Sequence, residues 1–213
     1  MQTIFSKTRA TIIAITLLVL FISCDSFKKP DTTTDQFDKS GKMYSLVPKT
    51  TTVFWIGYKT TAKTPVKGQF TKLEIKESNP AKSAREALNG VEFSIPVSSL
   101  FSNEASRDTK LKEMFFGVMD QTEFLSGSLD VLNDSIVNVN LKMNGVSKEF
   151  PLSYFIDGQM LSMDGRINVE DWNALAAIES LHTVCEDQHT GNDGISKTWS
   201  EVGINVESYL KVE

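Results

Sequence analysis

Residue types that carry catalysis are scarce in this chain. It has two histidines and two cysteines among 213 residues. The motifs G-x-S-x-G, H-E-x-x-H and C-x-x-C are missing, and so is a glycine-rich phosphate loop. These patterns mark the common serine hydrolases, zinc proteases, thiol redox proteins and nucleotide-binding enzymes. We therefore expect a protein that is not an enzyme.

An excess of positive charge is missing as well. The chain has 22 Lys and Arg against 27 Asp and Glu, which gives a net charge of −5. Residues 1–23 carry Lys7 and Arg9 and no acid, so their removal would lower the net charge to −7. Phosphate backbones attract Lys and Arg. Nucleic acid is therefore not an expected partner.

The N-terminus has the pattern of a bacterial lipoprotein signal peptide. Two basic residues precede an apolar run over residues 12–22, which is short for a membrane span and typical of a signal peptide. Ser23-Cys24 then resembles a lipobox, in which the cysteine is acylated and becomes the mature N-terminus, although Phe21 stands where leucine is usual. Plain secretion and an uncleaved anchor are the alternatives.

These features predict three parts. Residues 1–23 are a signal peptide, residues 24–42 are a lipidated Cys24 with a flexible polar tether, and residues 43–213 are the folded domain. The lipid anchor would hold the protein at the cell envelope, on the periplasmic side or at the outer membrane. Cys185 is then left without a disulfide partner, so the stability of the domain must come from its core.

Alternating apolar and polar residues predict a mainly antiparallel all-β domain. The clearest pattern is residues 135–155, a hairpin around Asn144-Gly145. Two short helices are expected, over residues 106–116 with Asp108 near the helix start and over 171–185 with Asp171 as the cap. Together with further strands, about eight in all, these elements predict a closed barrel that can hold one small ligand. The other expected segments are strands over 52–58, 66–76 with a bend at Gly68, 91–97, 122–132, 160–169 and 199–212, and a helix or loop over 80–89.

Three stretches carry a family resemblance: Arg107–Lys112 leading to Phe115-Phe116, the hairpin Leu141–Lys148, and the Val-x-Gly-x-Phe turn from Val66 to Phe70. Together they resemble the YceI-like polyisoprenoid-binding family. The resemblance covers residues 43–213 and implies a lipocalin-like barrel whose tunnel holds a long isoprenoid chain. Where the family often has histidines, this chain has Tyr58 or Lys59 and Lys110.

A membrane-anchored lipoprotein that binds a polyisoprenoid or a similar long apolar lipid is the first functional hypothesis. No cofactor is expected besides this bound lipid. Core residues follow the same pattern as tunnel residues, so a filled barrel that only presents its surface to a partner protein is an alternative. The candidate tunnel residues are Phe93, Ile95, Phe115, Phe116, Val139, Leu141 and Met143.

A metal-binding or redox-linked site is a second alternative. His182, Cys185 and His189 bring both histidines and a cysteine within eight residues. On a helix they would share one side and present imidazole and thiolate to zinc or copper. A half-buried helix end explains the same residues, and we assign no metal on this pattern.

Overall fold

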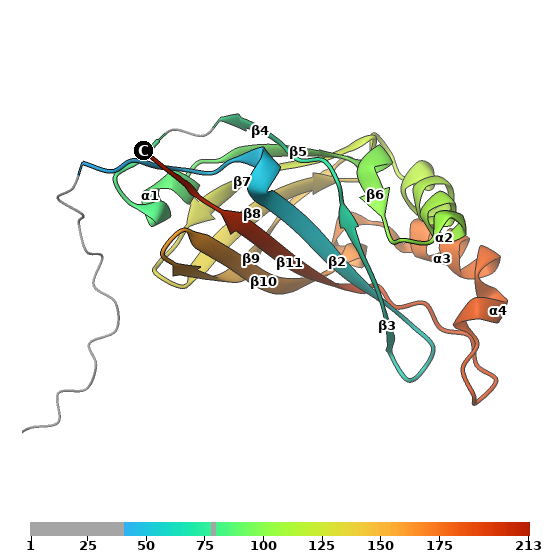
Figure 1. The fold of residues 1–213 in the computed structure, drawn as a ribbon. Coiled ribbons are helices and arrows are strands. Elements are labelled where there is room, and N and C mark those ends of the chain that lie inside the picture. The colour runs from blue at the N-terminus through green and yellow to red at the C-terminus, as the bar shows by residue number, and fades with distance from the viewer. Residues whose placement is uncertain (1–40, 78–79) are drawn as a thin grey trace, which may run out of the picture. The chain divides into compact units, whose positions relative to one another are not determined.

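A computed structural model describes residues 41–77 and 80–213. The predicted signal peptide, Cys24 and residues 24–40 of the predicted tether lie outside the described residues. The described part is mostly antiparallel β, a curled ten-stranded sheet with a few short helices (Figure 1). Along the sheet the strands follow the order β4-β5-β7-β8-β9-β10-β11-β2-β3-β6.

Most strands of this sheet match the segments expected from alternation, but the expected strand over 66–76 is divided at residues 71–73, and the short strand at residues 100–101 was not expected. A separate two-stranded pair joins β1 (Tyr44–Ser45) to β12 (Lys211–Val212). The first long strand lies beside the last, because β2 pairs antiparallel with β11. The ten strands are β2 (Thr51–Lys59), β3 (Thr64–Phe70), β4 (Glu74–Glu77), β5 (Glu92–Pro96), β6 (Leu100–Phe101), β7 (Phe124–Val131), β8 (Ile136–Met143), β9 (Val146–Asp157), β10 (Met160–Asn168) and β11 (Glu201–Tyr209).

The two ends of the sheet meet. Strand β4 follows β3 after three residues, and β6 follows β5 after the 3₁₀ turn Val97–Ser99. Because β3 pairs with β6 and β4 pairs with β5, these four pieces form two bent strands side by side. The amide of Thr71 donates to the carbonyl of Ser99 at 2.9 Å and continues the ladder across the bend. Counting each bent strand once gives the expected eight strands of a lipocalin-like barrel.

The β8–β9 hairpin is built as the sequence predicts. Asn144 and Gly145 have φ of 51° and 69°, and positive φ at both turn residues is what a type I′ turn requires. Val137, Val139, Leu141 and Met143 are all buried. The Asn144 side chain also accepts from the amide of Asp120 at 2.7 Å and donates to the carbonyl of Trp172 at 2.8 Å. The turn residue therefore ties three segments together.

The first predicted helix is present but irregular. Helix α2 (Ala105–Lys110) continues into a π-helical turn, Leu111–Phe115, and a 3₁₀ turn, Phe116–Val118. The cap is Glu104, whose carboxylate accepts from the amides of Ser106 and Arg107 at 3.0 and 2.7 Å. Asp108 lies in the first turn of α2, as expected, and its carboxylate also accepts from the amide and hydroxyl of Ser102 at 2.8 and 2.6 Å.

The second predicted helix begins later than expected. Val169–Trp172 is a 3₁₀ turn capped by Asn168, so Asp171 is not the cap. Asn173 then has φ of 56°, which interrupts the helix before α3 (Leu175–Val184) and the short α4 (Glu186–His189). Leu175 is consequently 52% exposed instead of lying on the buried face.

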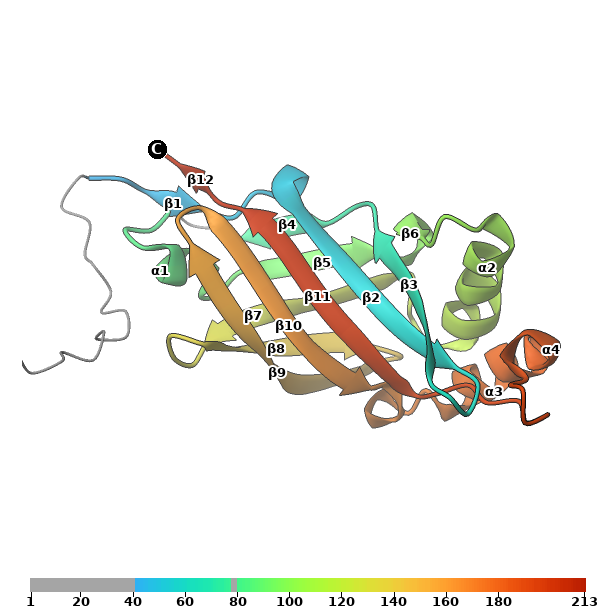
Figure 2. The ribbon, with the colours of Figure 1, turned by 60° about the horizontal axis from the view of Figure 1, so that its bottom comes forward.

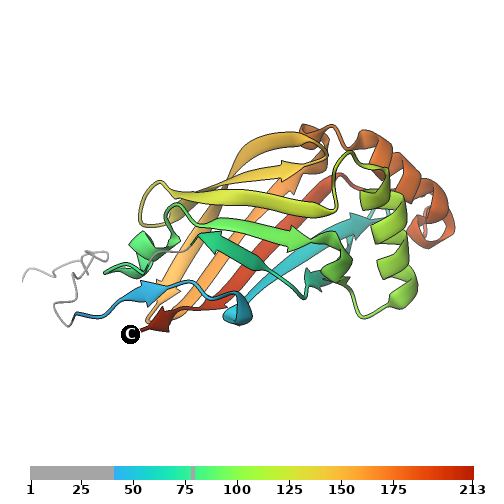
Figure 3. The ribbon, with the colours of Figure 1, turned by 90° about the horizontal axis from the view of Figure 1, so that it is seen from above.

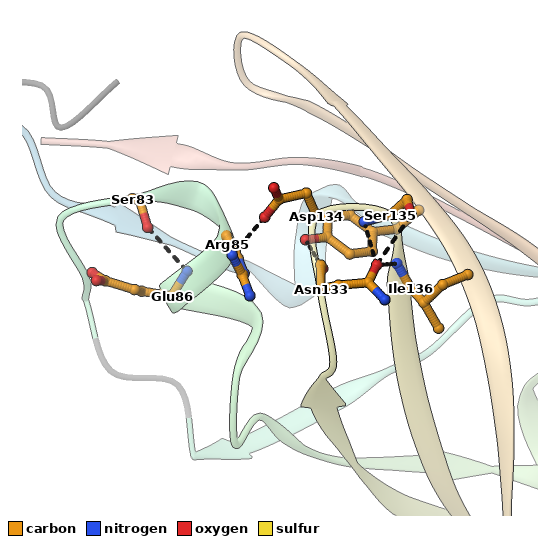
Figure 4. A network of polar contacts seen from close by, with 8 residues as sticks. Ser83, Arg85, Glu86, Asn133, Asp134, Ser135 and Ile136 are labelled. Atoms are coloured by element: carbon orange, nitrogen blue, oxygen red, sulfur yellow. Dashed lines mark hydrogen bonds and ion pairs between the residues drawn. The ribbon is translucent and has the colours of Figure 1, made fainter. Parts of the chain in front are cut away.

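Helices occupy both ends of the barrel. Helices α2, α3 and α4 lie together at one end, and α1 (Ala84–Leu88) lies at the other with β1 and β12 (Figures 2 and 3). Helix α1 is fixed by an ion pair of 2.5 Å from Arg85 to Asp134 in the β7–β8 loop (Figure 4). Leu88, the last residue of α1, and Val91 shortly after it are almost fully buried.

No helix among residues 41–77 and 80–213 has the length and apolar character needed to cross a membrane.

Candidate functional site

A cavity of about 350 Å³ lies inside the barrel at the end that carries α2, α3 and α4. Its volume falls in the range of small-molecule pockets. Strand β2 contributes Trp55 and Gly57, and the helices contribute Leu111, Ile178 and Leu181. We call this space the main cavity. Most of its lining is apolar, and its polar lining residues lie at the end of β2, at the cap and along α2, on α4 and just before β11.

A second cavity of about 110 Å³ lies nearer the α1 end, beside Thr51 and Val53 at the start of β2. We call it the inner cavity, and its lining is apolar apart from Thr51. Four side chains belong to the walls of both cavities, so a single layer of side chains separates the two spaces. These shared residues are Phe70, Leu125, Leu141 and Ile204.

The predicted tunnel residues all reach these cavities. Phe115, Phe116 and Met143 line the main cavity, and Phe93, Ile95 and Val139 line the inner cavity. The seventh, Leu141, lines both. Their contact with a lipid stays a prediction.

The consecutive phenylalanines reach the main cavity because the chain leaves regular α-helix there. The ring of Phe116 meets that of Phe115 edge to face with centroids 4.9 Å apart, and that of Phe70 at 6.5 Å. Such edge-to-face pairs hold aromatic side chains in place. They give the main cavity one aromatic wall.

Two glycines shape the cavity in opposite ways. A Cβ at Gly57 would meet no atom within 4 Å, and Gly57 follows the inward-facing Trp55 by two residues, so it leaves part of the cavity open. A Cβ at Gly68 would lie 2.1 Å from the Trp55 ring. The expected bend at Gly68 was wrong, because β3 pairs regularly with β2 through this residue. Glycine is needed there to make room for the indole.

The cavity-lining residues Trp55 and Gly57, and Gly68 beneath the Trp55 ring, were not selected from the sequence. The alternation of β2 carried a signal for the first two, because Val53, Trp55 and Gly57 fall on one side of a predicted strand. The signal for Gly68 was ambiguous, since a glycine inside a strand marks either a bulge or a close approach.

The mouth of the main cavity is basic. The Lys59 ammonium donates to the backbone carbonyl of Gln188 at 3.0 Å, and the Lys110 ammonium donates to the Gln188 side-chain oxygen at 2.7 Å. Arg107 and Glu104 also line this space. The Glu104 carboxylate is engaged with amides of α2 as its cap.

The two histidines share one hydroxyl beside this mouth. Oγ1 of Thr198 lies 3.1 Å from Nδ1 of His182 and 2.6 Å from Nδ1 of His189. A hydroxyl has one proton, so Thr198 donates to only one imidazole and must accept from the other. Burial, and then the nearby Lys59, His182 and Lys110, lower the pKa of His189 to about 4. His189 is therefore neutral at pH 7.

Cys185 lines the main cavity as a buried free thiol. Burial raises its pKa, against a smaller opposite effect of Lys110 and Lys59, so the thiol stays protonated at neutral pH. Over the described ranges, no group of three His, Cys, Asp or Glu side chains is placed to hold a metal ion. His182, Cys185 and His189 thus lie close to the cavity mouth. Both imidazoles share a hydrogen-bond partner there, the hydroxyl of Thr198.

The chain is similar to several proteins of known structure. A polyisoprenoid-binding domain from Saccharophagus degradans is 14% identical, with a TM-score of 0.58 over 80% of this chain and 98% of that one. BcnA of Burkholderia cenocepacia is 17% identical, with a TM-score of 0.49 over 76% and 96%. The YceI protein of Campylobacter jejuni is 18% identical, with a TM-score of 0.46 over 68% and 85%. A search of curated proteins gives no match.

The family model described as the YceI-like domain matches residues 44–208, which is most of the chain and all of the long strands but the last residue of β11. The chain belongs to the YceI-like family.

Proposed function

We propose that this protein binds a polyisoprenoid or a similar long apolar lipid inside its barrel and acts by binding instead of by catalysis. The observation that carries the proposal is the pair of adjoining apolar cavities of about 350 and 110 Å³. Membership of the YceI-like family and the polyisoprenoid-binding domain of similar fold support it.

The energetics favour a hydrocarbon chain. Each methylene that leaves water contributes about 0.8 kcal/mol, so a five-carbon isoprene unit contributes roughly 4 kcal/mol before the cost of ordering the chain. A polar ligand would lose its hydrogen bonds to water in the inner cavity, where Thr51 is the one lining residue with a polar side chain. The lipid chain therefore enters from the main cavity and extends toward the inner one.

A lipid anchor at Cys24 would keep this site near its source of ligand. Our proposal places the protein at the cell envelope, on the periplasmic side or at the outer membrane, with the barrel on a polar tether over residues 25–42. A flexible chain of that length spans roughly 21–25 Å. Such a reach allows lipid to pass between the bilayer and the barrel mouth.

The cavity can be tested by filling it at Gly57. Native mass spectrometry of the delipidated protein should show uptake of one geranylgeraniol by the wild type and none by Gly57→Leu. The added side chain enters open space on a strand that accepts it, so the variant should remain folded. Thr52→Leu, on the opposite side of the same strand, is the control and should bind as the wild type does. A wild-type barrel that stays empty would contradict lipid binding and favour the protein-interaction alternative.

A further inference from the structure

We propose that the mouth of the main cavity is an oxyanion site, and that the lipid held by the barrel carries a phosphorylated head group bound by Lys59 and Lys110. This inference rests on the proposed function and names the head group of that ligand.

Two elements far apart in the sequence bring the ammonium groups together. Lys59 is the last residue of β2 and Lys110 is the last residue of α2, and both line the main cavity. Their Nζ atoms lie 3.0 and 2.7 Å from two oxygens of one residue, Gln188. Both side chains are half-buried, so water screens their charges less than on an open surface.

The positive charge at this mouth is not neutralised by acids. Within the described part of the chain, no ion pair joins Lys59 or Lys110 to a carboxylate. Glu104 is the one acid on the cavity wall, and it is engaged as the cap of α2, whereas Arg107 adds a further positive group. The chain as a whole is acidic, with a net charge of −5. A basic mouth on an acidic protein favours an anion at that place.

Gln188 occupies the position that an anionic oxygen would take. An ammonium has three N–H donors, and the contact with Gln188 uses one on each lysine. Hydrogen bonds to an ionised acceptor are about twice as strong as those to a neutral one. Gln188 is exposed on the short helix α4, so its side chain can turn away from Lys110, and the Lys59 side chain can turn away from the backbone carbonyl of Gln188. A phosphate has three oxygens and about two negative charges at neutral pH, which suits two ammonium groups and a guanidinium.

The apolar cavity behind the mouth favours a phosphate that is part of a larger ligand. A free phosphate would use the rim and leave the space lined by Trp55, Phe116 and Leu181 without an occupant. A lipid phosphate uses both, with its chain in the apolar space and its head group between the lysines.

Paired probes test the head group separately from the chain. Geranylgeranyl phosphate and geranylgeraniol are titrated into the delipidated protein and followed by the fluorescence of Trp55 and Trp199, which line the cavity. We expect the phosphate to bind roughly tenfold or more tightly than the alcohol, from charge-assisted hydrogen bonds. Lys59→Met and Lys110→Met should each lose roughly tenfold for the phosphate and keep the affinity for the alcohol. Lys67→Met, on the exposed side of β3, is the charge-matched control and should change neither.

The outcomes separate the two proposals. Equal binding of both lipids, with no effect of either lysine variant, overturns the oxyanion site and leaves lipid binding standing. If neither lipid binds to folded wild type, the proposed function itself fails. Inorganic phosphate that binds as tightly as geranylgeranyl phosphate, and loses affinity in the same variants, assigns the site to free phosphate and overturns the lipid head group. Circular dichroism of each variant confirms that it is folded.

Discussion

The close approach of Gly68 to Trp55 leads to a sharp prediction for Gly68→Ala. The new Cβ would lie 2.1 Å from Cζ2 and 2.5 Å from Cε2 of the indole, and 2.8 Å from the backbone oxygen of Phe101. Carbon atoms in contact are about 3.5–4.0 Å apart, so the ring must move by about 1.5 Å. The main cavity borders the indole, and the ring can move only into that space.

The cost of this movement follows from what the indole contacts. Its N–H is buried and has no hydrogen-bond partner among residues 41–77 and 80–213, so no hydrogen bond within this part of the chain is lost when the ring shifts. The Phe101 oxygen belongs to β6 and cannot retreat without disturbing the β3–β6 pairing. Overpacking of this kind typically costs about 1–3 kcal/mol, and we expect a loss of about 2 kcal/mol in the free energy of unfolding. Lipid uptake should fall as well, because the displaced ring fills part of the cavity.

Urea unfolding followed by tryptophan fluorescence measures this loss. The midpoint should decrease while the slope with urea stays unchanged, since the same surface is exposed on unfolding. Gly57→Ala is the matched control. Gly57 lies on β2, two residues after Trp55, and the substitution should change the stability by less than about 0.5 kcal/mol because no atom lies near the added Cβ. Equal stabilities of the two variants would refute the reasoning.

Three further predictions concern the layer between the cavities, the histidine pair and the anchor. Leu141→Ala should join the two cavities, cost about 2–5 kcal/mol in stability, and shift binding toward longer isoprenols in native mass spectrometry; unchanged chain-length preference would contradict this. The pKa of His189 is about 4 when folded and 6.5 in its reference state, so the unfolded chain binds more protons between these values and stability falls as the pH drops from 6.5 to 4. The full shift corresponds to about 3 kcal/mol, which partial exposure reduces to about 1–2 kcal/mol. In urea titrations at several pH values, His189→Asn should lack this part of the pH dependence, and an unchanged curve would count against it. Cys24→Ala should abolish incorporation of labelled palmitate, whereas label retained by the variant would place the anchor elsewhere.

Alternation was enough to predict the barrel but not the details of its helices. Strands β8 and β9 follow the period of two because one side meets the barrel interior and the other meets water. The helices were predicted from apolar residues at helical spacing and from acidic residues near their starts. Asp108 does lie in the first turn of α2, but Glu104 is the cap there, and the left-handed conformation of Asn173 delays α3. The apolar spacing indicated neither the Glu104 cap nor the interruption at Asn173.

The basic mouth could not be predicted from sequence patterns, because its residues are distant in the sequence. Lys59, Lys110 and Gln188 come from a strand and two helices, and only the closed barrel brings them within hydrogen-bond distance. The histidines at 182 and 189 looked like a local cluster, yet their shared partner Thr198 belongs to the segment that returns toward β11. Groups assembled from distant elements follow from topology and not from spacing.

The separation of cavity from core depends on small residues more than on large ones. Leu141 and Met143 would face inward in a filled barrel and in a hollow one, so their pattern cannot distinguish the two. Gly57 differs, because a glycine on the inward side of a strand in regular conformation removes volume that no neighbour replaces. The indole of Trp55, held over Gly68, then leaves the space beside it open instead of filling it. The main cavity is therefore open at Gly57, an inward-facing strand position where a larger side chain would fill the space.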